Sequence, residues 1–303
     1  MIGKNAPVKF GATFPTTEIG DDPIAIRDIA QAAESLGYSH IVAYDHVLGA
    51  EHAGREPKLW GPYTERDAFH EPFVLFGFLA GVTTTIEFET AIIILPQRQT
   101  VLAAKQAAEV DILSGGRLRL GIGTGWNPVE YEGLGIPWEG RGARFDDQIS
   151  LMRQLWSEPV LDVTTSHHRI DRAGILPRPR RPIPLWFGGS TKVAFRRAAR
   201  VGDGFTFASA GRKTVEQATE LRALVTAEGR DPANFPLEFT LMYGLGETRW
   251  ASSVESAREA GIDYVTINAM STTAAWTGME APGFGTAGEH IAALERFMQV
   301  VGG

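Results

Sequence analysis

Short runs of β-branched and aromatic residues alternate along the chain with stretches in which apolar positions recur at the helical period. This alternation indicates repeated β/α units. The apolar runs predict strands at residues 8–14, 39–44, 86–94, 117–123, 184–187, 204–207, 236–243 and 264–267. The periodic stretches predict helices at about 23–36, 71–81, 99–113, 145–156, 191–201, 213–227, 251–260 and 287–299.

Eight β/α units in 303 residues are typical of a closed parallel barrel, since an open doubly wound sheet usually has fewer strands. No Gly/Ser-rich linker or change in composition divides the chain. The sequence therefore predicts an α/β protein, a (β/α)8 TIM barrel, with residues 1–303 forming one domain.

Three segments are too long to be plain connections. Residues 45–70 follow the second predicted strand, residues 157–183 precede the fifth, and residues 268–286 follow the eighth. The loops after the strands build the active face of a parallel barrel. We therefore expect 45–70 and 268–286 to wall or cover a pocket.

Composition narrows the classes of molecule that the protein is expected to bind. The formal net charge of −7 argues against a nucleic-acid surface, which needs clustered Lys and Arg, and favours a small-molecule substrate. The absence of cysteine excludes disulfides and thiolate chemistry. No run of 18 apolar residues occurs, and the first residues lack the pattern of a secretion signal. We therefore expect a cytoplasmic protein that does not bind a membrane.

Catalytic groups of this fold lie at the carboxyl ends of strands, and the second predicted strand ends in Tyr44-Asp45-His46. Histidine titrates near neutral pH, so His46 beside an acid suits proton transfer or a hydrogen bond to a cofactor ring. The alternative is a structural histidine, hydrogen-bonded at a strand corner.

Other histidines give no sign of a metal site. No carboxylates stand at ordered spacings around them, so we predict no metal and expect them to be solvated. They are His52, His70, His167 and His168.

The fourth predicted strand runs into Gly123-Thr124-Gly125-Trp126. Glycines here allow a backbone to approach a ligand closely, and Trp126 suits a pocket wall. The spacing resembles a dinucleotide fingerprint, but Asn127 and Pro128 stand where a third glycine is needed, and we expect no helix to begin there. A Rossmann site is therefore disfavoured.

The fifth predicted strand ends in Gly188-Gly189-Ser190-Thr191 and leads directly into a helix. Free N–H groups, the helix dipole and two hydroxyls would converge there, which predicts a phosphate site. A tight turn with a serine N-cap is the alternative. At the third strand, Ala91 and Ile92 suit the underside of a flat ring, although any barrel core contains such residues.

Four motifs together resemble the luciferase-like monooxygenase superfamily. They are Tyr44-Asp45-His46, the run from Thr90 to Arg98, the block at 104–156 that contains LSGGRLRLGIGTGW and GRGARFDD, and PIPLWFGGST with the residues that follow it to 205. The resemblance covers most of residues 8–245 and is closest to the subgroup that uses coenzyme F420, a deazaflavin. It implies a barrel enzyme, commonly dimeric, that moves a hydride to or from an organic substrate without inserting oxygen.

The resemblance also implies roles for particular residues. Asp45 and His46 would lie beside the deazaflavin ring, with His46 the proton donor or acceptor. Ala91 and Ile92 would form a non-prolyl cis peptide behind the ring. The ring and its ribityl chain would be lined by Thr124, Gly125 and Trp126, and the cofactor phosphate would be held by Gly188, Gly189 and Ser190.

The chain departs from the sugar-phosphate dehydrogenases of that family at two positions. Those enzymes have Glu where Trp126 stands and Trp where Ala50 stands, which argues against a sugar-phosphate substrate. Two other functions remain open: a monooxygenase that uses FMN, and a barrel that binds a cofactor without turnover.

Overall fold

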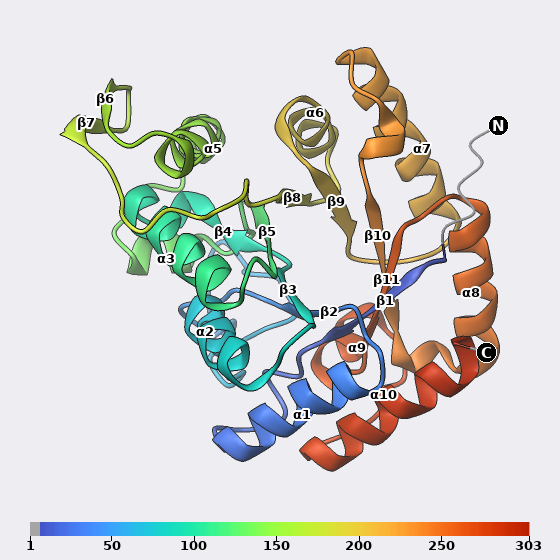
Figure 1. Cartoon of the computed structure of the whole chain (residues 1–303). Coiled ribbons are helices and arrows are strands. Elements are labelled where there is room, and N and C mark those ends of the chain that lie inside the picture. Colours follow the sequence, from blue (N-terminus) through green and yellow to red (C-terminus); the bar gives the residue numbers. More distant parts are fainter. Residues whose placement is uncertain (1–6, 303) are drawn as a thin grey trace.

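The computed structural model describes residues 7–302, apart from the side chain of Ala275. Eight parallel strands close into a barrel, and helices surround it (Figure 1). The order around the barrel is β1, β2, β3, β5, β8, β9, β10 and β11, and β11 pairs with β1 to complete the ring. The predicted (β/α)8 TIM barrel is therefore confirmed.

The barrel strands lie close to their predicted ranges. They are β1 (Lys9–Thr13), β2 (His40–Ala43), β3 (Glu87–Thr90), β5 (Leu118–Gly123), β8 (Leu185–Gly188), β9 (Gly204–Phe207), β10 (Leu237–Met242) and β11 (Tyr264–Asn268). Phenylalanines of the strands, such as Phe88, Phe187 and Phe239, are almost completely buried. Burial on this scale supplies the main drive for the barrel to close.

Eight of the helices match the predicted ones. They are α1 (Pro23–Ser35), α2 (Pro72–Val82), α3 (Thr100–Leu113), α5 (Arg141–Ser157), α6 (Lys192–Val201), α7 (Arg212–Ala227), α8 (Glu247–Glu259) and α10 (Ala287–Val301). The start of a helix was the least predictable feature. Helices α5 and α8 begin earlier than expected because Gly140 and Gly246, both at positive φ, end the preceding loops there. No described helix is long and apolar enough to cross a membrane.

The third predicted strand is two strands. β3 ends at Thr90, the peptide bond between Ala91 and Ile92 is cis, and β4 (Ile93–Ile94) then pairs with β5. The 3₁₀ helix η1 (Leu95–Gln97) follows. The chain thus turns sharply at the carboxyl end of β3, in the place where the family resemblance suggested a cis peptide.

Several elements lie in segments expected to be loops. The hairpin of β6 (Leu161–Thr164) and β7 (Arg169–Ala173) projects beside α5 (Figure 1). Helix α9 (Ser271–Thr277) follows β11, and η2 (Pro232–Asn234) and η3 (Tyr243–Leu245) flank β10.

Helix α4 (Pro128–Gly133) corrects the expectation that no helix begins at Asn127-Pro128. The Asn127 side chain accepts a hydrogen bond from the Val129 N–H at 3.0 Å, and Pro128 takes the first helical position, where its missing N–H is not needed.

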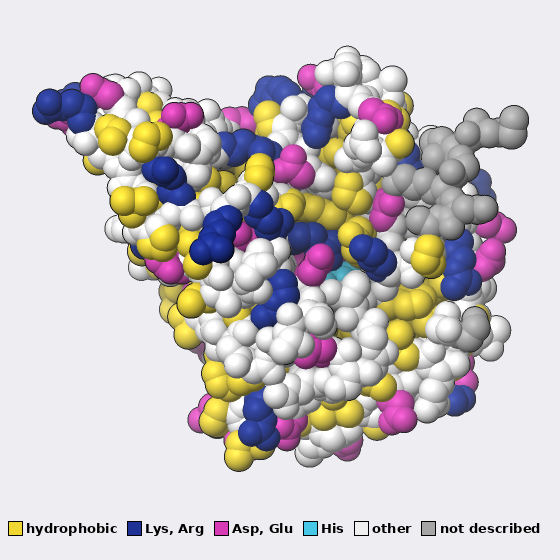
Figure 2. All heavy atoms as spheres, in the orientation of Figure 1, with side chains coloured by type: hydrophobic (Ala, Val, Ile, Leu, Met, Phe, Trp, Pro, Cys, Tyr) yellow, Lys and Arg dark blue, Asp and Glu magenta, His cyan; other side chains and the backbone are white. Residues whose placement is uncertain are grey.

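One face of the molecule is drawn in Figure 2. Lys and Arg side chains gather near its middle, with Asp, Glu and apolar side chains among them. The charges on this face are therefore mixed rather than uniformly basic.

Candidate active site

His46 lies just beyond the carboxyl end of β2, at the mouth of the barrel. Its side chain is only 9% exposed. Three aromatic rings meet the imidazole edge-on, at centroid distances of 5.1 Å for Tyr63, 4.8 Å for Phe69 and 5.6 Å for Trp126. The imidazole therefore sits in a largely apolar, water-poor setting, in which a proton transfer is shielded from solvent.

A buried carboxylate holds the imidazole. Nδ1 of His46 lies 3.4 Å from Oε2 of Glu130, which is fully buried on α4. The other oxygen, Oε1, accepts hydrogen bonds from the N–H groups of Val47 and Leu48. Nε2 of His46 has no hydrogen-bond partner within residues 7–302 of the structure. Glu130 thus places a buried carboxylate oxygen, which has no hydrogen-bond partner in the described part of the chain, at ion-pair distance from Nδ1 and leaves Nε2 free to act.

Asp45 uses both carboxylate oxygens inside the protein. Oδ1 accepts from Arg98 at 2.6 Å, and Oδ2 accepts from the Ile94 N–H at 2.9 Å. Burial raises the pKa of Asp45, while the adjacent Arg98 guanidinium opposes that rise. Arg98 is in turn paired with Glu71 at 2.9 Å. Asp45 therefore ties the end of β2 to β4 and so orders the segment that carries His46.

Ile92 fills the centre of the mouth. A Cβ atom at Gly123 would lie 2.7 Å from Ile92 Cδ1, and one at Gly188 would lie 2.8 Å from Ile92 Cγ2. Either contact is too short for a real side chain, so the Ile92 side chain requires glycine on both neighbouring strands. Packing against Ile92 is a second reason for these glycines, besides the approach of a ligand. The ends of β3, β5 and β8 thus meet at one apolar floor.

The loop after β5 passes beside this floor. Gly125 has φ +63°, and a Cβ there would lie 2.8 Å from Ile94 Cγ2. The carbonyl of Thr124 accepts the Tyr131 hydroxyl at 2.8 Å. Trp126 then reaches His46. Residues predicted separately on β2, β3, β5 and β8 are therefore brought to one mouth.

The turn between β8 and α6 is exposed and glycine-rich. Gly189 has φ +128°, a conformation that side chains rarely adopt. The residue that caps α6 is Thr191, whose hydroxyl accepts the Ala194 N–H at 3.2 Å, so the alternative of a serine N-cap is wrong. Ser190 is exposed next to it. Free N–H groups of the first turn and the helix dipole make this turn a suitable place for a phosphate.

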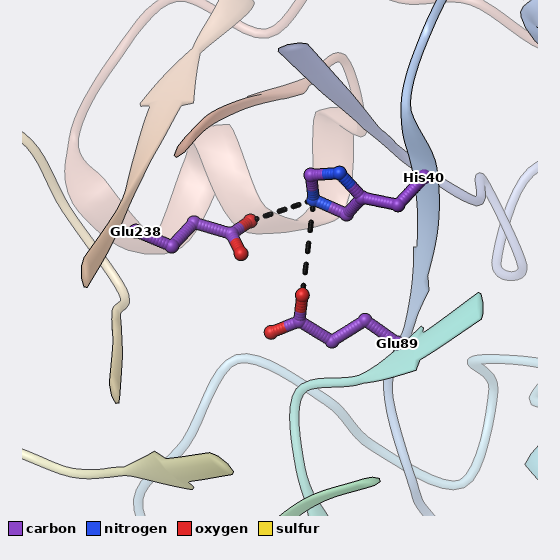
Figure 3. Close-up of side chains that lie close together, drawn as sticks. All are labelled: His40, Glu89 and Glu238. Carbon is purple, nitrogen blue, oxygen red and sulfur yellow. Dashed lines mark hydrogen bonds and ion pairs between the residues drawn. The ribbon is translucent and has the colours of Figure 1, made fainter. Parts of the chain in front are cut away.

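Sequence reasoning missed a buried polar cluster at the opposite end of the barrel. His40, Glu89 and Glu238 come from three strands and point toward one another (Figure 3). Nε2 of His40 lies 3.1 Å from Glu238 Oε1 and 3.8 Å from Glu89 Oε2. All three side chains are fully buried. Their signal in the sequence was a titratable residue inside otherwise apolar strands, but only the fold brings the three together.

The electrostatics favour a structural role for this cluster. The Arg119 guanidinium lies 3.2 Å from Glu89 Oε2 and 3.8 Å from Glu238 Oε2. Burial lowers the pKa of His40 to about 3, helped by Arg119. Burial and Glu238 together raise the pKa of Glu89 to about 8, against the opposing effect of Arg119. The three side chains could hold a metal ion by their spacing. Arg119 already supplies the positive charge that such an ion would bring.

Some histidines that we expected to be solvated are bonded instead. Nδ1 of His168 lies 2.9 Å from Asp147 Oδ2, and its Nε2 lies 2.6 Å from Thr100 Oγ1. The expectation is wrong for His168 because the β6–β7 hairpin folds back onto α3 and α5. In His52 and His70, Nε2 is buried without a hydrogen-bond partner in the described part of the chain.

A closed parallel barrel with a shielded histidine, an apolar floor and a glycine turn at one mouth defines a ligand-binding barrel. The chain belongs to the luciferase-like monooxygenase family, whose model matches residues 2–295. This confirms the resemblance seen in the sequence.

Two groups of relatives are similar in sequence. An uncharacterized protein of Mycobacterium tuberculosis is 36% identical over 185 residues, which cover 58% of this chain and 62% of that protein. The F420-dependent glucose-6-phosphate dehydrogenase of Nakamurella multipartita is 28% identical over 221 residues, covering 72% of this chain and 61% of that enzyme. The match thus spans about three fifths of each relative's own length.

Solved structures share the fold. An F420-dependent secondary alcohol dehydrogenase, in complex with an F420-acetone adduct, has a TM-score of 0.73 at 16% identity over 98% of this chain and 99% of that one. A long-chain alkane monooxygenase has a TM-score of 0.72 at 11% identity, covering 98% and 92% of the two chains. At these identities the likeness supports the barrel fold alone.

Proposed function

We propose that this protein is an oxidoreductase that transfers a hydride between coenzyme F420 and a small organic substrate. The observation that carries the proposal is His46, shielded by aromatic rings and 3.4 Å from Glu130 at Nδ1, at the same mouth as the Ile92 floor. The relatives and fold neighbours named for F420 chemistry support the choice of cofactor.

The residues present suit a flat tricyclic ring with a phosphate tail. Gly123 and Gly188 leave room for the Ile92 side chain, which gives the mouth an apolar floor. In the proposal Ala91 and Ile92 support the ring, Thr124, Gly125 and Trp126 line its edge, and Gly188, Gly189 and Ser190 bind the phosphate. When bound, F420 would supply a ring carbon that gives or takes the hydride.

Side chains of this protein would carry out the proton transfer that accompanies the hydride transfer. His46 would give a proton to the substrate at Nε2, or take one there, because Glu130 orients the ring through Nδ1. Asp45 is hydrogen-bonded to Arg98 and to the backbone of Ile94, so it would hold the segment that carries His46 in place rather than touch the substrate or cofactor. Tyr63, Phe69 and Trp126 would exclude water from the transfer.

A fluorescence titration with F420 and with FMN tests the cofactor. We expect F420 to bind at micromolar concentration or below and FMN to bind at least tenfold more weakly. Submicromolar binding of FMN without binding of F420 would favour the alternative, an FMN monooxygenase. A non-catalytic barrel would bind F420 but exchange no hydride with a broad panel of alcohols and enones. We expect glucose 6-phosphate to be inactive because Trp126 stands where sugar-phosphate dehydrogenases have Glu.

We further propose that the protein is a homodimer. Large apolar side chains on α2 and α3 are left exposed, in an arrangement more typical of an interface than of a free surface. They are Val74 (70% exposed), Phe78 (40%), Val101 (43%), Leu102 (52%) and Leu113 (65%). Light scattering should give twice the chain mass, and Phe78→Glu should shift the protein toward monomer. A wild-type monomer at micromolar concentration would contradict this proposal.

A further inference from the structure

Three tryptophan rings form a stack that begins beside His46 and ends in solvent. Trp126 meets the imidazole edge-on at 5.6 Å. Trp60 stacks on Trp126 at 6.1 Å with an interplanar angle of 29°, and Trp276 stacks on Trp60 at 5.7 Å and 17°. The rings come from three segments, namely the loop after β5, the loop after β2 and helix α9.

Exposing the two outer tryptophan rings to water is energetically unfavourable. Trp60 is 62% exposed and Trp276 is 48% exposed. Val47 and Leu48, which directly follow His46, are 46% and 43% exposed. Exposed apolar side chains of this kind, beside the carboxyl ends of the barrel strands, are typical of a place where a ligand binds.

Local geometry supports the stack. Gly61 follows Trp60 at φ +149°, and a Cβ there would lie 2.1 Å from the Trp126 ring. Only glycine lets the loop lie so close over that ring. The Tyr63 hydroxyl lies 3.3 Å from Thr273 Oγ1, which joins the same loop to α9. The stack and one hydrogen bond thus link the two segments that cover the mouth.

The chemistry of the stack selects one kind of ligand. Aromatic faces attract other flat rings at centroid distances of about 4.5–7 Å, in addition to the gain from buried area. Among residues 7–302, no Lys or Arg lies over any of the three tryptophan rings. A negatively charged substrate would therefore find no cation on these faces, whereas a neutral flat ring would find extended π surface.

We infer that the substrate is a neutral molecule with a flat conjugated ring, which enters between Trp126 and Trp60, whose rings otherwise stack on each other, so that Trp60 and Trp276 cover it. This inference rests on the proposed function. For a quinone, reduced F420 would give a hydride and His46 a proton, so that the quinone becomes a hydroquinone and the cofactor becomes oxidised. The ring would then lie within reach of His46, because Trp126 contacts both.

Equilibrium dialysis with menadione, a neutral two-ring quinone, tests the inference. The matched ligand is 2-decalone, which is neutral and has two rings but is saturated. We expect menadione to bind at least tenfold more tightly than 2-decalone, with or without F420. Trp60→Ala should weaken menadione binding roughly 2- to 10-fold, the usual range for one aromatic pair, and leave 2-decalone nearly unchanged. Trp60→Phe should restore most of the loss, and Trp138→Phe, outside the stack, should have no effect.

Equal binding of the two ligands would overturn the inference, as would an unchanged menadione affinity in Trp60→Ala. F420 affinity, measured separately on each variant, separates this failure from that of the proposed function. Binding of F420 without selective binding of menadione rejects only the flat-ring substrate. Selective binding of menadione without binding of F420 rejects the hydride-transfer proposal on which the inference rests.

Discussion

Replacing Arg119 tests how the amino end of the barrel is held together. Its guanidinium is the cation facing Glu89 and Glu238, at 3.2 and 3.8 Å, and it also lies over the rings of Trp186 and Tyr264. Arg119→Met keeps most of the apolar contact with those rings and removes the charge. Glu238 is then left buried without the cation it faces, next to Glu89, whose raised pKa of about 8 keeps it protonated at pH 7.

The expected loss is large. Removing one partner of a buried ion pair costs roughly 3–5 kcal/mol because the remaining charge stays buried. In a protein of this size each kcal/mol lowers the melting temperature by about 2–4 °C, so Arg119→Met should melt roughly 6–20 °C lower. Adding Glu238→Gln should recover part of the loss, because it replaces the carboxylate that Arg119 no longer faces with a neutral amide. F420 affinity should change less than about twofold, because His46 lies at the other end of the barrel.

Differential scanning calorimetry at pH 7 measures these shifts. Arg258→Met is the matched control, since Arg258 pairs with Glu255 at 3.2 Å while 44% exposed, and exposed pairs contribute only about 0–1 kcal/mol. Equal melting temperatures for Arg119→Met and Arg258→Met would refute the assignment of Arg119 as the charge that balances the cluster.

Further outcomes concern the mouth and the pH dependence. His46→Ala should keep F420 binding but lower turnover about 100-fold or more, and unchanged turnover would show that His46 is structural. Glu130→Gln should lower kcat by a smaller factor and leave KM nearly unchanged. Gly188→Ala, 2.8 Å from Ile92, should lower stability by about 1–3 kcal/mol and weaken F420 binding, whereas Gly288→Ala, with no atom within 4 Å, should do neither. Wild-type stability should fall as pH rises from about 6.5 to 8, since the folded chain keeps a proton on Glu89, whose pKa is raised from 4.5 to about 8, while the unfolded chain has lost it. Below pH 6.5 the unfolded chain protonates His40 while the folded chain does not, because burial lowers the pKa of His40 to about 3, so this group makes stability fall as pH decreases. Between pH 6.5 and about 4.5 the effects of His40 and Glu89 on stability cancel. Below about pH 4.5 only the effect of His40 remains, and stability falls as the pH is lowered further. Glu89→Gln should abolish the fall above pH 6.5, and a slope that persists in this variant would assign it to another group.

The barrel was predictable because the hydrophobic periodicity and the turn residues indicate the same order of strands and helices along the whole chain. The break in the third strand was not, because residues 86–94 contain no glycine or proline that would mark it, and a change of pairing partner leaves no sign in composition. Helix α4 was missed because Asn127-Pro128 was compared only with the glycine of a dinucleotide fingerprint, whereas the asparagine caps a helix and the proline begins it.

The candidate site was predictable only in part. Strand ends pointed to His46 and to the glycine turns, but not to Glu130, which reaches His46 from a helix that was not expected. The stack of Trp60, Trp126 and Trp276 depends on the paths of two loops and on the position of α9, which no periodic pattern in the sequence predicts. The charges of the buried cluster are far apart in sequence and meet only when the barrel closes.

A crystal structure with F420 bound is the most direct test of the central claim. We expect the deazaflavin ring to lie against the Ala91–Ile92 peptide, the phosphate to meet the Gly188–Ser190 turn, and Nε2 of His46 to face the open side of the ring. A ring bound elsewhere, or one that leaves His46 outside hydrogen-bond reach of any substrate placed over it, would contradict the account.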